Sequence, residues 1–481
     1  MNSNRIEGVG LIGMIAIVFG SMVGGGIFNI AQNMASAAGL GAVIISWLIT
    51  GFGMVFLVLT FKILSDSRPD LNQGIYRYAQ EGFGNYIGFN IAWGYWLCVA
   101  FGNVSFAIML NDAVGAFFPV FLQHRWPSLL FCWGIVWGMF GLVINGVMTA
   151  SFINTVMTIL KFGAIVLIIV LLVIYAKLET LSSNMWEITS STGVSSTTDL
   201  TSQIMSTMLV TMFCFVGVEG GVMLSSYARK KSDVGKASVI GFYSALIVYA
   251  MISILCFGVR SREELAGMHD PSVAYVLRSI CGSWAYYFVL ITVIVSLLSG
   301  FIAWTLLCAQ TPFGAAEMHM LPTQFLKTNR HNVPYFGLCT STIFMSLFII
   351  LVCTAPDVFM AALNLTTIMV LPAYAFSGAF LWKISVKEIG VKRIKYCFIG
   401  ILCTLYCIWC IFAGGAPIFF ASSILYVAGI YFYYVTWKQK CIRTGEYIRL
   451  MTKSEMFLCL ILIICAIASV ILISIGKITL S

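Results

Sequence analysis

Residues 21–28 read SMVGGGIF, with three consecutive glycines inside a segment otherwise built from apolar side chains. Each glycine costs a helix about 1 kcal/mol relative to alanine. Three in succession (Gly24, Gly25 and Gly26) therefore predict that a helix is interrupted here. What the interruption does depends on whether the segment lies in water or in lipid.

The composition is that of a polytopic membrane protein. The chain has 481 residues, of which 60% are hydrophobic and only 9% are charged, whereas soluble domains carry roughly 25% charged residues. A membrane crossing needs about 20 apolar residues. Thirteen segments satisfy that need, at 8–31, 39–64, 86–112, 127–147, 153–176, 203–226, 237–258, 282–309, 334–354, 357–381, 395–413, 416–437 and 455–476.

The distribution of basic residues predicts the orientation. With the N-terminus in the cytoplasm, twenty Lys and Arg residues lie on inner segments and six on outer ones, which is the bias found in membrane proteins. This distribution accounts for the net charge of +9 without a nucleic-acid partner. The 15 cysteines lie mostly in apolar segments and the four histidines lack ligand spacing, so we expect no metal, no cofactor and no enzyme activity.

A second glycine-rich interruption divides the chain into comparable halves. It reads FVGVEGGV at residues 215–222, and Gly217 follows Gly24 by 193 residues. Paired interruptions at corresponding positions indicate a transporter built from an inverted repeat. The expected units are residues 8–176, residues 203–381 and an accessory region at 395–476. The alternative is that the small residues only allow close helix packing.

The two interruptions predict a site for an α-amino acid. Irregular backbone at membrane depth survives where it lines a cavity. A half-helix that starts within the membrane presents free N–H groups, and Gly24, Gly25 and Gly26 let a carboxylate approach that backbone directly. Carbonyl groups near Gly217, Gly220 and Gly221 suit an ammonium group.

Two charged residues stand inside predicted membrane spans. Glu219 lies in the second interruption, where it is expected to hold a cationic substrate, carry a proton or couple gating to pH. Lys161 lies well inside the fifth span and can replace a bound cation between helices, which makes sodium unnecessary. The alternatives are a structural carboxylate at Glu219 and a snorkelling lysine at 161. Tyr95, Asn103 and Trp304 are aromatic or polar groups deep in the membrane, and aromatic faces suit a cationic ligand, with plain packing as the alternative. Thr366 and Thr367 are further candidates for the cavity wall.

Several stretches together carry a family resemblance over roughly residues 8–440. They are GSMVGGGIF, RPDLNQGIYRYAQEGFG, YWLCVAFGN, FVGVEGG and AWTLLCAQT. With them the chain resembles the amino acid/polyamine/organocation superfamily, and within it the basic amino acid/polyamine antiporters. The likeness is greatest to arginine/agmatine exchangers of the chlamydial type.

The resemblance implies a LeuT-like fold: all-α, with two inverted five-helix repeats, broken helices 1 and 6 and a site at mid-membrane. The residues that it places at the site are Met22, Gly25, Gly26, Tyr95, Cys98, Asn103, Phe106, Phe213, Val216, Glu219 and Trp304. The chain departs from the enteric members, which have tryptophan at position 213, serine at position 25 and no lysine at position 161. A thirteenth span also exceeds the usual twelve.

The function implied is exchange of extracellular L-arginine for intracellular agmatine across a bacterial inner membrane. The expected partners are these small molecules, or ornithine, and the lipid bilayer, and the resemblance also admits a homodimer. Arginine/ornithine exchange and proton-coupled amino-acid uptake remain open, the latter favoured by Lys161. A nutrient receptor is disfavoured because no soluble domain is present, and a channel because no filter-like run appears.

Overall fold

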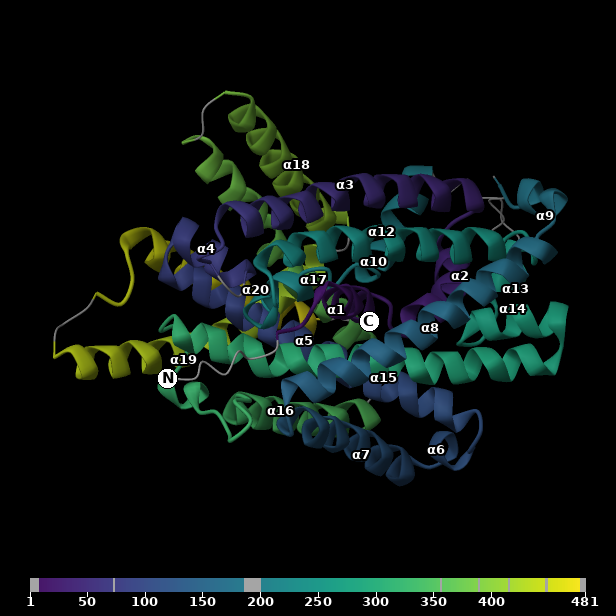
Figure 1. The fold of residues 1–481 in the computed structure, drawn as a ribbon, viewed down its shortest axis with the longest axis horizontal. Coiled ribbons are helices and arrows are strands. Elements are labelled where there is room, and N and C mark those ends of the chain that lie inside the picture. Colours follow the sequence, from purple (N-terminus) through teal and green to yellow (C-terminus); the bar gives the residue numbers. More distant parts are fainter. Residues whose placement is uncertain are drawn as a thin grey trace.

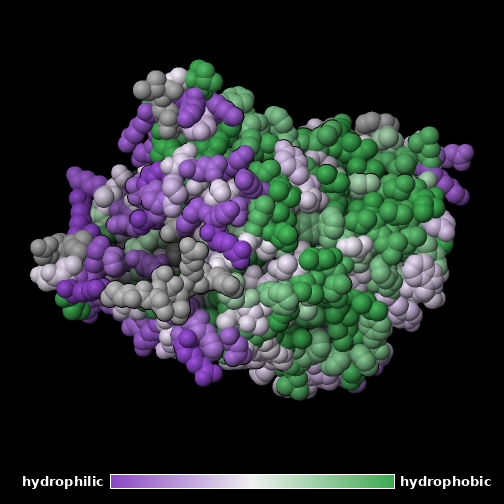
Figure 2. All heavy atoms as spheres, in the orientation of Figure 1, coloured by the Kyte–Doolittle hydropathy of each residue, from purple (hydrophilic) through white to green (hydrophobic). Residues whose placement is uncertain are grey.

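The fold is a bundle of membrane-spanning α-helices. The computed structural model describes residues 8–71, 74–185, 200–354, 357–387, 390–413, 416–445 and 449–475. Most long helices run along the long axis of the molecule (Figure 1). Apolar side chains cover the middle and right of the surface in Figure 2, whereas hydrophilic side chains gather at its left end. This distribution is the one expected of a protein with a lipid-facing band and a polar cap.

The first half of the chain forms nine helices in the described residues. They are α1 (Leu11–Met22), α2 (Gly26–Ala37), α3 (Leu40–Ser67), α4 (Ile75–Phe83), α5 (Asn85–Gly115), α6 (Val120–Gln123), α7 (Arg125–Ile144), α8 (Val147–Tyr175) and α9 (Leu178–Ser183).

The remaining described residues form eleven α-helices and two short 3₁₀ turns. The helices are α10 (Leu200–Phe213), α11 (Gly220–Met223), α12 (Lys231–Cys256), α13 (Arg262–Ala266), α14 (Ser272–Cys281), α15 (Ser283–Glu317), α16 (Tyr335–Thr354), α17 (Asp357–Ser385), α18 (Val391–Ala413), α19 (Ala416–Thr444) and α20 (Lys453–Ser474). The 3₁₀ turns are η1 (Ser225–Tyr227) and η2 (Thr323–Leu326).

The predicted polytopic membrane architecture is confirmed. Within the described residues, 12 helical segments are long and apolar enough to cross a membrane, with α1 and α2 counted as one. The sixth predicted span corresponds to α10 and α11. Neither helix alone is long enough to cross a membrane, because the span is interrupted between them. The first seven residues, which include the predicted cytoplasmic N-terminus, lie outside the described part of the chain.

Both predicted helix interruptions are present, and they touch each other. The first separates α1 from α2 at residues 23–25, and the second separates α10 from α11 at residues 214–219. Gly217 has a φ of +110°, and a Cβ there would lie 2.9 Å from the backbone of Ser21. Glycine is required at this position by the positive φ and by the close approach of the backbone at Ser21.

The interrupted helices lie inside a cage of long helices. The apolar windows of α5, α15 and α17 are largely buried, and α15 and α17 both pack against α5. α1 packs against α8, α12 and α15. By contrast, α20 packs mainly on α19 and presents most of its surface outward. The buried helices therefore supply most of the walls around the interruptions.

Candidate functional site

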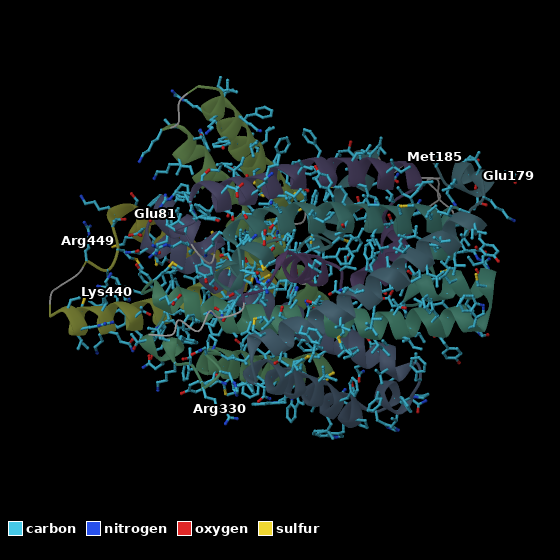
Figure 3. All side chains as sticks on the ribbon, in the orientation of Figure 1. Glu81, Glu179, Met185, Arg330, Lys440 and Arg449 are labelled. Atoms are coloured by element: carbon cyan, nitrogen blue, oxygen red, sulfur yellow. The ribbon has the colours of Figure 1, made fainter. Side chains whose placement is uncertain are left out.

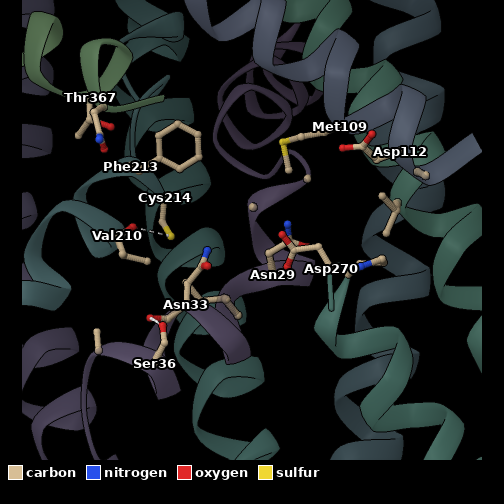
Figure 4. A pocket seen from close by; sticks show the side chains of 18 residues that line it. Asn29, Asn33, Ser36, Met109, Asp112, Val210, Phe213, Cys214, Asp270 and Thr367 are labelled. Atoms are coloured by element: carbon tan, nitrogen blue, oxygen red, sulfur yellow. Dashed lines mark hydrogen bonds between the residues drawn. The ribbon is translucent and has the colours of Figure 1, made fainter. Parts of the chain in front are cut away.

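A cavity of about 400 Å³ reaches the glycine run from one side of the bundle. Its walls come from α2, α5, α10, α15 and α17 and from the loop that precedes α14. Gly25 and Gly26 form part of the wall, together with Phe213 from the end of α10. Figure 4 shows the polar side chains of Asn29 and Asp270 close together in this cavity.

The carbonyl groups that end α1 are occupied by side chains from other helices. The last four carbonyls of a helix lack partners within it. Trp304 donates its indole N–H to the carbonyl of Ser21 at 2.9 Å. The Tyr249 hydroxyl donates to the carbonyl of Met22 at 3.0 Å. Both donors are buried, so they hold the end of α1 rigidly in the bundle.

Lys161 completes this set of donors from α8. Its ammonium nitrogen lies 2.6 Å from the carbonyl oxygen of Val23 and 3.2 Å from that of Gly20. The Ser296 hydroxyl donates to the carbonyl of Gly24 at 2.9 Å. Lys161 has 0% exposure, which excludes snorkelling to the membrane surface. The side-chain nitrogen of Lys161 thus lies at the negative end of the α1 dipole.

The N–H groups that begin α2, unlike the carbonyl groups that end α1, lack hydrogen-bond partners among the described residues. The amides of Gly25, Gly26 and Ile27 have no acceptor among the described residues. Gly25 and Gly26 also line the cavity. The first N–H groups of a helix carry partial positive charge and form a ready binding site for an anion. At the first interruption, the acceptors are therefore satisfied by protein while the donors remain available to a ligand.

Glu219 joins three elements around the second interruption. Its carboxylate accepts a hydrogen bond from the Tyr95 hydroxyl of α5 at 2.9 Å. It also accepts bonds from the Tyr374 hydroxyl of α17 and from the backbone N–H of Gly217 at 3.0 Å. Glu219 is 1% exposed, and in this conformation it is not part of the cavity lining. Tyr374 was not predicted from the sequence, because an isolated tyrosine in an apolar span carries no pattern.

The carbonyl group predicted to bind an ammonium is already occupied. The carbonyl oxygen of Gly217 accepts the Ser21 hydroxyl at 2.8 Å and the N–H of Gly220 at 2.8 Å. In this conformation, the acceptors that face the cavity are side-chain carboxylates and amides instead.

Aromatic side chains pack around the glycine run. The rings of Phe106 and Trp304 meet edge to face with centroids 5.3 Å apart. Phe106 lies directly against Gly24, where an added Cβ would come within 2.8 Å of the ring. Phe213 lies against Gly26, where an added Cβ would be 3.3 Å from the ring. Of these three aromatic residues, Phe213 is the one that lines the cavity.

Four further predicted residues lie in the closed interior instead of the cavity wall. Cys98, Asn103, Val216 and Thr366 are all buried. The Asn103 amide donates to the sulfur of Cys308 at 3.3 Å, and its carbonyl oxygen has no partner among the described residues. Thr367, the neighbour of Thr366, faces the cavity. The structure thus brings Gly25, Gly26, Phe213 and Thr367 together at the cavity, and the other predicted binding residues are not part of its lining.

Two carboxylates in the cavity were missed by the sequence analysis. Asp112 lies near the end of α5, and Asp270 lies in the loop before α14. Partial removal from water and the neighbouring carboxylate of Asp112 raise the pKa of Asp270 to about 6. No sequence pattern marks them, because acidic residues at the ends of membrane spans are common.

A second, larger cavity of about 1340 Å³ lies at the other end of the bundle. Its lining includes Asp70, Arg77, Tyr227 and Glu317, and none of the predicted site residues. Beside it, the chain before α1 pairs with the chain after α11: Val9 donates its N–H to the carbonyl of Tyr227 at 2.8 Å. The described conformation therefore opens the glycine run to one side only.

Comparisons with known proteins give one consistent family. The model of the amino acid permease family matches residues 9–435. The chain is 39% identical over 438 residues to the arginine/agmatine antiporter of Chlamydia felis, covering 90% of each chain. It is 40% identical over 434 residues to that of Chlamydia abortus, covering 89% of each chain.

Two further similarities extend over most of the chain. A putative amino-acid transporter of Clostridium perfringens is 36% identical over 477 residues, covering 97% of this chain and 98% of its own. The solved structure of MhsT in complex with L-phenylalanine superimposes with a TM-score of 0.55 over 84% of this chain and 98% of its own, at 13% identity. At that identity the structural likeness supports the fold alone, and it agrees with the predicted LeuT-like architecture.

Proposed function

Because this chain belongs to the amino acid permease family, we propose that it is an antiporter that imports L-arginine and exports agmatine by alternating access. The chlamydial relatives named arginine/agmatine antiporters support this assignment. The membrane is a bacterial inner membrane, and the basic residues favour a cytoplasmic N-terminus. Residues 8–176 and 203–381 form the two inverted repeats of this proposal.

The observation that carries the proposal is the asymmetry of the first interruption. The carbonyls of Ser21 and Met22 accept hydrogen bonds from Trp304 and Tyr249. By contrast, the amides of Gly25 and Gly26 have no acceptor among the described residues, and these two glycines line a cavity of about 400 Å³. A carboxylate is the substrate group that fits unpaired N–H groups at a helix start. Arginine carries that group and agmatine does not, so this end of the cavity distinguishes the two substrates.

The guanidinium group of either substrate binds to the carboxylates of the same cavity. Asp112 and Asp270 line it, and neither makes an ion pair within the described residues. A guanidinium group binds carboxylates with paired, charge-assisted hydrogen bonds. Arginine and agmatine share this group, so both bind at this end. Phe213 adds a ring face close by, which favours a cation.

Exchange of these substrates has a definite electrical consequence. Agmatine lacks the carboxylate of arginine and therefore carries one more net positive charge. Each cycle moves that charge outward and, after arginine is decarboxylated inside the cell, removes the equivalent of one proton from the cytoplasm.

Two buried charges support coupling without sodium. The side-chain nitrogen of Lys161 donates to the carbonyls of Gly20 and Val23, in the position where a bound cation would otherwise bridge α1 and α8. We assign to Glu219 the role of a gating group, because its bonds to Tyr95 and Tyr374 join the second interruption to α5 and α17.

The second candidate function is proton-coupled uptake of an amino acid. The buried ammonium of Lys161 favours it, since a group that contacts α1 directly can couple protonation to movement of that helix. Arginine/ornithine exchange uses the same poles of the cavity, because ornithine also has both a carboxylate and a cationic end.

The test is transport into liposomes. Purified protein is reconstituted into vesicles loaded with agmatine, ornithine, arginine or buffer, and labelled arginine uptake is followed without sodium. Uptake that requires internal agmatine and responds weakly to ornithine supports the proposal. Uptake into buffer-loaded vesicles driven by a pH gradient contradicts exchange and favours the second candidate, and strong uptake into ornithine-loaded vesicles favours the ornithine exchanger.

A further inference from the structure

A small pocket lies between the accessory helix α19 and the chain that follows α15. Its volume is about 250 Å³. His319, Lys440 and Arg443 line it from two parts of the chain that are far apart in sequence, and its other lining residues are neutral. Three nitrogen-bearing basic side chains thus converge on one pocket outside the transport site.

The walls of this pocket are held in place by hydrogen bonds. Gln439 of α19 accepts the backbone N–H of Thr323 at 3.1 Å, and its amide donates to Gln324 at 3.2 Å. Thr436, which also lines the pocket, is 5% exposed. The pocket is therefore a built feature where α19 meets η2, and not a gap between mobile side chains.

Within the part of the chain that the structure describes, the basic side chains of the pocket have no acidic partner. Lys440 and Arg443 make no ion pair with any described residue, and no acidic side chain belongs to the pocket lining. Two cations one helical turn apart repel each other unless an anion lies between them. The chemistry that this arrangement suits is a phosphate group, which accepts hydrogen bonds from several donors at once.

The position of the pocket matches the headgroup region of a membrane. Residues 416–437 of α19 carry no charged side chain, and Lys438 is the first basic residue after them. Tyr434 and Trp437 lie just before the pocket, with ring centroids 5.6 Å apart, and such aromatic residues mark the interface between lipid and water. Figure 3 shows Lys440 at the left of the view, at the opposite end of the molecule from Glu179.

We propose that His319, Lys440 and Arg443 form a binding site for a phosphate group at the membrane surface, supplied by the headgroup of an anionic phospholipid. Basic pockets between membrane helices on the cytoplasmic side are suited to such headgroups. Occupation of the site ties accessory helix α19 to the segment that follows α15, the helix that carries Trp304. The proposal is independent of which substrates the protein exchanges.

The test compares the lipids retained by purified full-length variants. Lys440→Gln/Arg443→Gln removes two pocket charges, and Lys438→Gln/Arg449→Gln removes two charges from the same end of the molecule outside the pocket lining. Each protein is purified with phosphatidylglycerol or phosphatidylcholine, and bound lipid is counted by native mass spectrometry. We expect wild type and the control to retain phosphatidylglycerol selectively, and the pocket variant to retain it about fivefold less for each charge removed.

Equal retention of phosphatidylglycerol by wild type and the pocket variant overturns the proposal, as does equal loss in the control. A parallel arm adds inorganic phosphate to lipid-free protein and follows its melting temperature. One further outcome is that phosphate raises the melting temperature of the wild type but not of the pocket variant, while neither protein retains phosphatidylglycerol selectively. That outcome supports an anion site and overturns the phospholipid headgroup as its ligand. If the double variant elutes as an aggregate, the single variants Lys440→Gln and Arg443→Gln replace it.

Discussion

The ammonium nitrogen of Lys161 lies 2.6 Å from the carbonyl oxygen of Val23, inside the interruption that follows α1. Lys161 is fully buried and has no carboxylate partner among the described residues. Its charge is therefore balanced by backbone carbonyls at the negative end of a helix dipole. This contact links α8, a long outer helix, directly to the segment that lines the proposed substrate site.

Substitution of Lys161 by methionine is expected to destabilise the protein and to reduce exchange at least tenfold. The carbonyls of Gly20 and Val23 lose a charged donor, and each such bond contributes about 1.5–3 kcal/mol. Thermal unfolding and arginine exchange measure the two effects. Lys177→Met, at an exposed position before α9, is the control. Exchange by the wild type is expected to be equal in sodium and potassium buffers, and a sodium requirement would contradict the role assigned to Lys161.

Substitution of Gly26 by alanine is expected to weaken arginine binding more than agmatine binding. The added Cβ would lie 3.3 Å from the Phe213 ring and cover the N–H groups proposed to bind the carboxylate. Loss of about one hydrogen bond corresponds to roughly a tenfold change in affinity. The measurement is the KM of each substrate in reconstituted vesicles. Gly134→Ala, where an added Cβ meets no atom within 4 Å, is the control. An equal loss of affinity for arginine and agmatine would contradict binding of the substrate carboxylate at this end of the cavity.

With the proposed cytoplasmic N-terminus, the loop that holds Asp270 lies on the external side, between the outer residues Arg262 and Arg278. The affinity for external cationic substrates is therefore expected to fall as the external pH drops below about 6. The pKa of Asp270 is raised to about 6, so its neutral form becomes populated below that pH and no longer attracts a guanidinium group. Asp112 and His269 are the charged neighbours that influence this titration. The check is the KM for arginine between acidic and neutral external pH.

Asp270→Asn is expected to raise the KM for arginine at neutral pH and to flatten its pH dependence, because the amide does not titrate. Glu179→Gln serves as the control, since Glu179 lies at the same end of the molecule but not in the cavity lining. An unchanged pH profile in Asp270→Asn would show that another group controls external binding.

Substitution of Tyr374 by phenylalanine is expected to slow exchange by about 10-fold or more with a smaller effect on KM. The Glu219 carboxylate loses a hydroxyl donor in a buried site, where a hydrogen bond to a charged group contributes about 1.5–3 kcal/mol. The separate measurement of kcat and KM in vesicles distinguishes gating from binding. Tyr426→Phe is a matched control, because that hydroxyl is buried and has no partner among the described residues. A loss confined to KM would assign Tyr374 to binding instead.

The sequence was sufficient for the architecture because the bilayer imposes strict requirements on composition. A lipid-facing segment must be long, apolar and helical, so the spans could be placed by counting residues. The interruptions at Gly24–Gly26 and Gly217 were equally predictable, since runs of glycine at membrane depth need a special reason. The family resemblance rested on these same stretches, and the match over residues 9–435 confirms it.

The sequence could not decide which predicted residues face a cavity. Tyr95, Cys98 and Trp304 share their motifs with the binding residues, yet here they lie in the closed interior. Exposure to a cavity depends on the relative positions of helices in one conformation of an alternating-access protein. Two cavities at opposite ends of the bundle, only one of which reaches Gly25, are a property of tertiary packing.

The class of protein, its membrane spans and the two places where the helices break follow from the amino-acid sequence. How each break is used depends on the packing of helices that are far apart in the chain. Lys161, Tyr249 and Trp304 come from three different helices to occupy the carbonyls that end α1, while the N–H groups of Gly25 and Gly26 remain available. Local propensity sets where backbone groups become free, but long-range packing sets which of them find a partner.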